Sequence, residues 1–152
     1  MKEAGASEAG RRIATECLAV RVRRLGRVIT RIYDAALAPH GINIAQLNLL
    51  AAIAVAKRPR PTDLTRLLDV EKSTLSRDLT RMQQRGWVRS DPVPARRGRS
   101  LALTPAGSRV LIQARPAWEK AQAAARAELG RRSFAQLQKL LSPPFDVGGQ
   151  LR

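Results

Sequence analysis

The sequence predicts a mainly α-helical protein with one small β-hairpin, an α+β fold class arranged as a winged helix-turn-helix with helical segments at both ends. Two observations support this prediction. Residues 62–86 hold two short amphipathic helical patterns separated by a turn, and residues 87–103 hold two strand-like segments around an arginine-rich loop. A helix pair followed directly by a hairpin is typical of a winged helix, in which the second helix of the pair enters the major groove of DNA.

The chain is strongly basic, and this limits the classes of partner that it is expected to bind. Its 152 residues include 28 Lys and Arg but only 12 Asp and Glu, a formal net charge of +16. Such a charge favours a polyanionic partner, because phosphate binding relieves the self-repulsion and releases counterions. Nucleic acid is the first candidate and an anionic membrane the second. No apolar run approaches the roughly 20 residues of a membrane span, and the start lacks a signal peptide's apolar core. We therefore expect a cytoplasmic protein that does not enter a membrane.

The N-terminal third is expected to begin irregularly and then form two helices. Residues 1–10 are small and polar and are expected to be frayed. Residues 12–37 repeat apolar side chains at intervals of four and three, which predicts one long helix with an apolar stripe. The stripe consists of Leu18, Val22, Leu25, Ile29, Ile32 and Ala36. The opposite side carries Arg23, Arg24, Arg27 and Arg31. Asn43 and Gln46 then form a capping box for a helix through about Ala56, and residues 57–61 form a stiff linker.

The helix-turn-helix pair follows the linker. Thr62 is the predicted N-cap of the first helix, and Gly86 is the predicted stop of the second. Apolar residues at helical spacing define the inward face of both helices. They are Leu64, Leu67 and Leu68 in the first helix and Leu75, Leu79 and Met82 in the second. The remaining residues of the second helix must then face outward.

Those outward residues are the candidate DNA contacts. The set comprises Thr62, Lys72, Ser73, Thr74, Ser76, Arg77 and Arg81. Short hydroxyl side chains near a helix N-terminus can approach base edges or phosphates, and arginine reaches phosphate or guanine. The second helix is therefore predicted to be a recognition helix.

The hairpin after the recognition helix is predicted to be a β-wing. Its strands are expected at residues 87–90 and 100–103, and the loop between them contains two prolines, a glycine and three arginines, Arg96, Arg97 and Arg99. Arginines of this kind contact the sugar-phosphate backbone or enter a narrow, electronegative minor groove. A solvated loop is the alternative for an isolated arginine cluster. Its place beside a recognition helix favours DNA contact.

The C-terminal third is expected to be helical and to form part of a dimer. Thr104 and Pro105 are a cap and a first-turn proline, and the helix should continue to Gly130, with a kink or local break at Pro116. A last helix over residues 134–141 ends before two prolines. The apolar stripes of the terminal helices exceed what one winged-helix unit can cover, and the many alanines of residues 114–127 allow close helix approach. We infer a homodimer.

Several separate motifs resemble the MarR (multiple antibiotic resistance regulator) family of winged-helix transcription factors. The matching segments are residues 37–47, 69–77, 84–88 and 96–107, including Ser73-Thr74-Leu75-Ser76-Arg77 and Leu101-Ala102-Leu103-Thr104-Pro105. The resemblance covers about residues 17–130. It implies a triangular homodimer whose terminal helices interlock while two winged lobes straddle double-stranded DNA. In this family an aspartate usually precedes the two wing arginines, where this chain has Ala95, and the cap at Glu71 is usually an aspartate.

These observations divide the chain into a flexible N-terminus (1–10), a single MarR-type domain (11–142) and a flexible tail (143–152). Within the domain, residues 12–38 and 104–142 are the predicted dimerisation helices, and residues 43–103 are the DNA-binding lobe.

Three further residues are candidates for sensing a signal. Cys17 is either an oxidant sensor, as the resemblance implies for some members, or a small buried hydrophobe, which we favour. His40 lies in a Pro-His-Gly turn and is either a ligand or a turn residue, and turn packing is favoured. Trp118 either lines a cavity for an aromatic effector or packs in the core or an interface, and packing is favoured.

An enzyme is not expected. The single histidine and the single cysteine could form a nucleophile pair, but nothing around them resembles an oxyanion site. The sequence shows no metal-ligand spacing and no glycine-rich phosphate loop. We therefore expect no cofactor and no metal. The leading hypothesis is a repressor that binds a pseudo-palindromic operator as a homodimer and is released by a small molecule or an oxidant. The alternative is a non-specific basic protein associated with the nucleoid or with RNA. The short polar residues at positions 73–77 favour the first, because a binder that relies on charge alone has no use for them.

Overall fold

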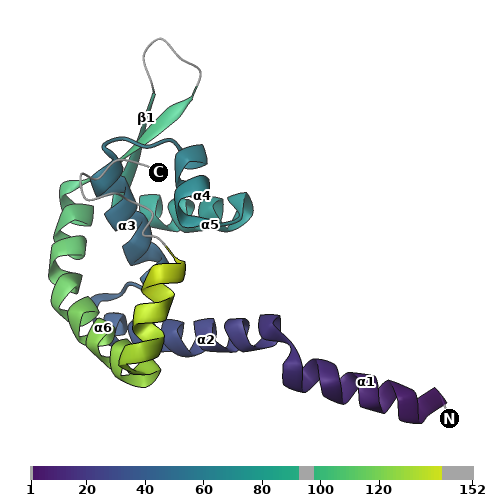
Figure 1. Cartoon of the computed structure of the whole chain (residues 1–152). Coiled ribbons are helices and arrows are strands. Elements are labelled where there is room, and N and C mark those ends of the chain that lie inside the picture. Colours follow the sequence, from purple (N-terminus) through teal and green to yellow (C-terminus); the bar gives the residue numbers. More distant parts are fainter. Residues whose placement is uncertain (1, 93–97, 142–152) are drawn as a thin grey trace.

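A computed structural model describes residues 2–92 and 98–141 of the chain (Figure 1). Its elements in order are α1 (Lys2–Glu16), α2 (Leu18–Leu37), a 3-10 turn (Ala38–His40), α3 (Ile44–Ala56), α4 (Pro61–Leu68), α5 (Lys72–Gln84), β1 (Val88–Pro92), β2 (Arg99–Leu103) and α6 (Pro105–Leu140). The described residues thus form helices and one two-stranded antiparallel sheet. This confirms the predicted mainly helical winged fold.

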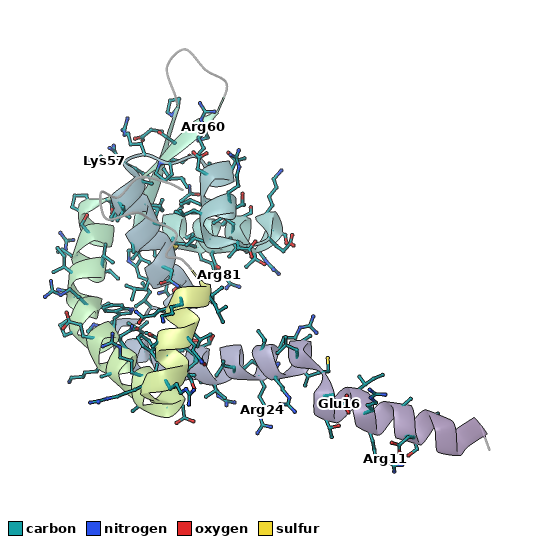
Figure 2. The ribbon with its side chains drawn as sticks, viewed as in Figure 1. Arg11, Glu16, Arg24, Lys57, Arg60 and Arg81 are labelled. Carbon is teal, nitrogen blue, oxygen red and sulfur yellow. The ribbon has the colours of Figure 1, made fainter. Side chains whose placement is uncertain are left out.

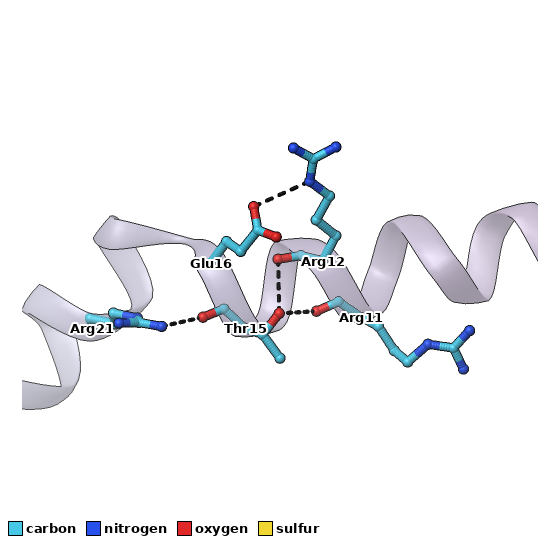
Figure 3. A network of polar contacts seen from close by, with 5 residues as sticks. All are labelled: Arg11, Arg12, Thr15, Glu16 and Arg21. Carbon is cyan, nitrogen blue, oxygen red and sulfur yellow. Dashed lines mark hydrogen bonds and ion pairs between the residues drawn. The ribbon is translucent and has the colours of Figure 1, made fainter.

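The N-terminal region differs from the prediction. Residues 2–10 are helical, where frayed chain was expected, and belong to a helix that runs to Glu16. The long helix expected from residue 12 is interrupted at Cys17, whose ψ of 114° is extended. The helix is favoured by its alanines and by ion pairs one turn apart, Glu8 with Arg11 and Arg12 with Glu16. At the break, the Arg21 guanidinium donates to the carbonyl of Thr15 and so satisfies an open helix end (Figure 3). Helix α1 projects away from the rest of the chain (Figure 1).

The core lies inside the winged lobe, where α2, α3, α4, α5 and β2 meet. Its fully buried large side chains come one from each of these elements: Leu37, Leu50, Leu64, Met82 and Leu101. The predicted inward residues Leu75 and Leu79 are buried as well, and so are Leu47 and Ile53 of α3. Leu49 and Ala52 are also buried, because neighbouring elements surround α3 on most sides.

The linker before α4 is attached to the wing. The Leu101 N–H donates to the carbonyl of buried Pro59 at 2.9 Å, and Arg58 forms an ion pair with Asp91 of β1 at 2.6 Å. The hairpin itself pairs in a register that runs from Val88 opposite Leu103 to Pro92 opposite Arg99. The wing and the start of the helix pair are therefore held together.

Helix α4 begins earlier than predicted. Thr62 is not its N-cap, since the helix starts at Pro61 and the cap position belongs to Arg60. The Asp63 carboxylate accepts a hydrogen bond from the Arg60 N–H at 2.8 Å. The fixed φ of proline suits the first helical position, and this decides where the helix begins. The predicted capping box of Asn43 and Gln46 at the start of α3 is confirmed.

The end of α5 and the start of α6 form a joint. Helix α5 ends at Gln84, two residues before Gly86 (φ 68°). The N–H groups of Gly86 and Trp87 donate to the carbonyls of Gln83 and Met82, both at 2.9 Å. The Thr104 side chain donates to the Gly86 carbonyl and accepts from the Gly107 N–H at 3.1 Å. The last residue of the hairpin region thus caps α6 and contacts the end of the recognition helix.

Helix α6 continues through Pro116, which corrects the expected break there. Pro116 is exposed, so water can satisfy the carbonyl that it leaves without a partner. The non-helical residue is Gly130 (φ 73°, ψ 154°), as the predicted helix end at this glycine required. Beyond Gly130 the chain folds back beside the first part of α6 (Figure 1). Ala114, Ala121 and Ala125 are buried within the chain, so at least part of the alanine-rich surface serves packing inside one subunit.

None of the described helices is by itself long and apolar enough to cross a membrane. The segments Leu18–His40 and Ile44–Ala56 reach that length and hydropathy only when taken together, and they meet at a bend of 77°.

Candidate nucleic-acid interface

Helix α5 has an apolar inner face and a polar outer face. Leu75, Leu79 and Met82 are buried against the lobe. The sequence-predicted contact residues on α4 and α5 are all exposed: Thr62, Lys72, Ser73, Thr74, Ser76, Arg77 and Arg81. This division follows from the helical period, because burying the three apolar residues turns the hydroxyls and cations to solvent.

The cations of α5 are only loosely held. The Arg77 guanidinium lies 3.4 Å from the Thr74 hydroxyl, and the Arg81 guanidinium lies 4.0 Å from the Asp78 carboxylate. Contacts this long between exposed groups contribute little to stability. Both side chains can therefore exchange these contacts for a phosphate or a base edge. The Glu71 side chain makes no capping hydrogen bond to the first turn of α5, which leaves the amide groups there open to an anion.

A hollow of about 400 Å³ lies between α4, α5 and the hairpin. It brings together Thr62 of α4, Lys72 and Ser76 of α5, and Arg99 of β2, which the sequence places in three separate segments. Thr65, Gln83 and Ser90 also line the hollow and were missed by the sequence analysis. Thr80 lines it too, and its outward position follows from helical spacing, because it comes one turn after Ser76. Ser90 reaches the hollow only through the fold of the hairpin.

Arg99 is fixed on the hairpin. Its guanidinium donates to the Ser90 hydroxyl at 2.7 Å and to the Ser90 carbonyl. The other two predicted wing arginines, Arg96 and Arg97, lie outside the described residues, as does Ala95. Asp91, at the base of the wing, contacts both Arg58 and Arg89, at 2.6 Å and 3.5 Å. Within the described part of the hairpin, Asp91 is thus the acidic residue that orients arginines.

The candidate sensing residues lie apart from this surface. Cys17 is half-buried at the break between α1 and α2, although full burial was favoured, and His40 is exposed in the turn after α2. Trp118 is half-buried and lines a second cavity, of about 340 Å³, between α3 and α6. The other lining residues are Leu47, Asn48, Ala51, Leu111, Ile112 and Arg115. Among the residues that the structure describes, no group of three or more His, Cys, Asp or Glu side chains is placed to hold a metal ion.

The sequence and the fold are both similar to known transcriptional regulators. The model of the MarR family matches residues 40–97. The multiple antibiotic resistance protein MarR of Escherichia coli K12 is 33% identical over 97 residues, which cover 59% of this chain and 67% of that protein. Its counterpart in Salmonella typhimurium is 32% identical over the same length.

Solved structures agree with this similarity. A mutant of E. coli MarR complexed with operator DNA superposes with a TM-score of 0.76 at 25% identity, over 85% of this chain and 94% of that one. The Mycobacterium tuberculosis regulator MosR superposes with a TM-score of 0.69 at 31% identity, over 83% of this chain and 96% of that one.

Proposed function

Because the chain belongs to the MarR family of winged-helix transcriptional regulators, we propose that it is a homodimeric repressor. It occupies a pseudo-palindromic operator and leaves it when a signal changes the spacing of its two winged lobes. The hollow between α4, α5 and the hairpin is the observation that carries this proposal, because it places helix hydroxyls and a wing arginine on one surface. The E. coli relative that was solved with operator DNA supports operator binding by this fold.

Sequence-specific reading is favoured by the kind of residues exposed on α5. Ser73, Thr74 and Ser76 are short and polar, and Arg77 follows them on the same leading end of the helix. Hydrogen bonds from such groups to base edges discriminate between base pairs. The net charge of +16 supports a second candidate, a protein that binds nucleic acid through charge alone. The two candidates differ in whether a base substitution in the DNA changes affinity.

The homodimer is supported by apolar side chains that one subunit leaves exposed. Leu18 is 72% exposed and Val22 is 58% exposed on α2, and Leu140 is 78% exposed at the end of α6. Exposed apolar groups of this size on two terminal helices are typical of an interface. Two recognition helices related by a two-fold axis would then require half-sites about one helical turn apart, roughly 34–36 Å.

A small-molecule signal is supported by the cavity at Trp118. Its volume of about 340 Å³ is in the range of ligand sites, roughly 300–1,000 Å³. It lies between α3 of the winged lobe and α6, so a ligand bound there would contact both the lobe and a proposed dimerisation helix. Arg115 offers it one positive charge. An oxidant acting at the half-buried Cys17 is the alternative signal.

The test is the substitution Arg77→Ala, measured on duplexes from the region upstream of the gene and on single-base variants of them. If Arg77 reads a base, the variant loses about 1–3 kcal/mol of discrimination at one position of each half-site. Arg132→Ala is the matched control, because Arg132 is an exposed arginine on α6 and not on the recognition helix. Equal weakening on every duplex would make Arg77 a phosphate contact. Equal competition by bulk genomic DNA against the wild type would favour the charge-only candidate.

A further inference from the structure

Helix α2 has a basic face that the winged lobe does not use. Arg23, Arg24, Arg27 and Arg31 are all exposed and lie on one side of the helix, since residues three and four apart share a face. Most of the apolar residues of α2 lie on the opposite side, and Val20, which is 47% exposed, lies among the arginines. Figure 2 shows the Arg24 side chain pointing away from the winged lobe, and the wing lies at the other end of the molecule in Figure 1.

The arginines of this face differ from other exposed arginines on the helices. Three of those are paired with a glutamate one turn away: Arg11 with Glu8 at 2.7 Å, Arg12 with Glu16 at 3.2 Å and Arg115 with Glu119 at 3.0 Å. Within the described ranges 2–92 and 98–141, no acidic side chain lies within ion-pair distance of the four α2 arginines. Like charges four residues apart destabilise a helix. An external anion bound to this face would therefore stabilise helix α2, because it would reduce the repulsion between the arginines.

The same face contains a shallow hollow of about 450 Å³. It is lined by Arg23, Gly26, Arg27, Thr30 and Arg31. A Cβ at Gly26 would meet nothing within 4 Å, so packing inside the subunit does not require glycine there. Glycine within a helix is unfavourable relative to alanine, but it lets another backbone come close. Thr30 adds a hydroxyl donor beside the arginines.

We propose that the basic face of α2, formed by Arg23, Arg24, Gly26, Arg27, Thr30 and Arg31, binds the sugar-phosphate backbone of a second DNA duplex. Arg23 and Arg31 are separated by about 12 Å along the helix axis, so the row can follow successive phosphates of one strand. The guanidinium group forms paired hydrogen bonds to phosphate. Pairing of two subunits through the apolar side of α2 would leave the basic side open, so both contacts can coexist. One dimer would then hold an operator at its winged lobes and a second segment at its opposite end.

The experiment measures capture of a second duplex by a preformed complex. An operator duplex on beads is saturated with the protein and washed, and a fluorescent duplex of unrelated sequence is then added at increasing salt. The variant Arg23→Gln/Arg27→Gln/Arg31→Gln is compared with the wild type and with the charge-preserving control Arg23→Lys/Arg27→Lys/Arg31→Lys. Fluorescence anisotropy with a short operator duplex reports the winged lobe separately, and circular dichroism checks the fold. Arg27→Gln alone replaces the triple variant if that variant does not fold.

The wild type and the lysine control are expected to capture the second duplex, and the glutamine variant is expected to lose capture while it keeps its affinity for the short operator. In Arg27→Gln alone, the logarithmic salt slope of capture should flatten by about 0.9 if Arg27 contacts a phosphate. Capture by the glutamine variant at the wild-type level would overturn the proposal. Failure of the wild type to capture a second duplex would also overturn it. The same holds if operator binding is lost in parallel with capture, or if anionic phospholipid vesicles displace the second duplex. Capture without any preference among operators would contradict the proposed function and leave this proposal intact.

Discussion

Gly107, in the first turn of α6, lies directly against the backbone of Trp87, which follows the recognition helix. A Cβ at this position would lie 2.1 Å from the carbonyl oxygen of Trp87, a backbone atom that cannot turn aside. We predict that Gly107→Ala destabilises the protein by about 1–3 kcal/mol, because the helix must move away from the hairpin. Urea unfolding measures the effect. Gly10→Ala is the control, since a Cβ there meets nothing within 4 Å and alanine should stabilise α1 slightly. Equal stability of the two variants would contradict the close contact.

Tyr33 gives the fold a dependence on alkaline pH. It is the one tyrosine of the chain, and its half-buried hydroxyl donates to the side-chain oxygen of Gln122 on α6. Burial raises the pKa of Tyr33 above its ordinary value of 10.0, and the charge of Arg126 lowers it by a smaller amount. The folded state therefore holds this proton more tightly than the unfolded state. The resulting stabilisation is complete below pH 10 and is lost as the pH rises through the pKa of the folded protein.

We predict that the melting temperature of the wild type falls above pH 10 more steeply than that of Tyr33→Phe. Ultraviolet absorbance of the phenolate follows the same group directly, because no other tyrosine contributes. Parallel pH profiles for the two proteins would show that Tyr33 titrates in the same way folded and unfolded.

At the scale of residues, the sequence predicted which side chains are exposed better than it predicted which side chains lie next to one another. The outward side of α5 followed from three apolar residues at helical spacing, and all seven predicted residues on α4 and α5 are exposed. The hollow also contains Thr65 and Ser90, which come from elements whose relative placement depends on tertiary packing. Local spacing contains no information about that placement.

The wing is the element in which substitutions should change DNA binding without changing the stability of the fold. Arg96 and Arg97 belong to the loop that joins β1 to β2, and the described strands pair without them. We predict that Arg96→Ala/Arg97→Ala weakens DNA binding strongly and changes the free energy of unfolding by less than about 0.5 kcal/mol. Arg11→Ala/Arg12→Ala removes the same charge from α1, and that control should bind more tightly than the wing variant. Unchanged affinity of the wing variant would leave Arg99 as the wing's contact.

Elements were predictable where a local signal dominates. The capping box at Asn43 marked the start of α3 correctly. The glycines Gly86 and Gly130 marked where α5 and the first part of α6 end. Pro116 misled the prediction, because an exposed proline in a long helix can be tolerated when solvent replaces the missing partner. The break at Cys17 has neither a proline nor a glycine to mark it, and the sequence around it shows only continuous helical periodicity.

At the scale of the whole molecule, the exposed apolar groups of α2 predict assembly. We predict that Leu18→Asp/Val22→Asp shifts the protein from dimer to monomer in sedimentation, because each aspartate would place a charge in the apolar contact. Both side chains are more than half exposed in one subunit, so the substitution should leave the subunit folded. Arg23→Asp/Arg24→Asp, on the opposite side of the same helix, is the control. A double variant at Leu18 and Val22 that remains dimeric would place the interface elsewhere.

The joint between α5 and α6 has a mechanical consequence. Thr104 and Gly107 hold the first turn of α6 against Gly86 and Trp87, so the two helices cannot turn independently at this point. The part of α6 before Gly130 is about 37 Å long, and a sideways displacement of about 3 Å at its far end therefore equals a tilt of about 5° at the joint. A displacement of the far end of α6 is thus transmitted through the joint to the recognition helix. A ligand or partner that shifts its distant end by the width of one methyl group would change the angle at which α5 meets the major groove.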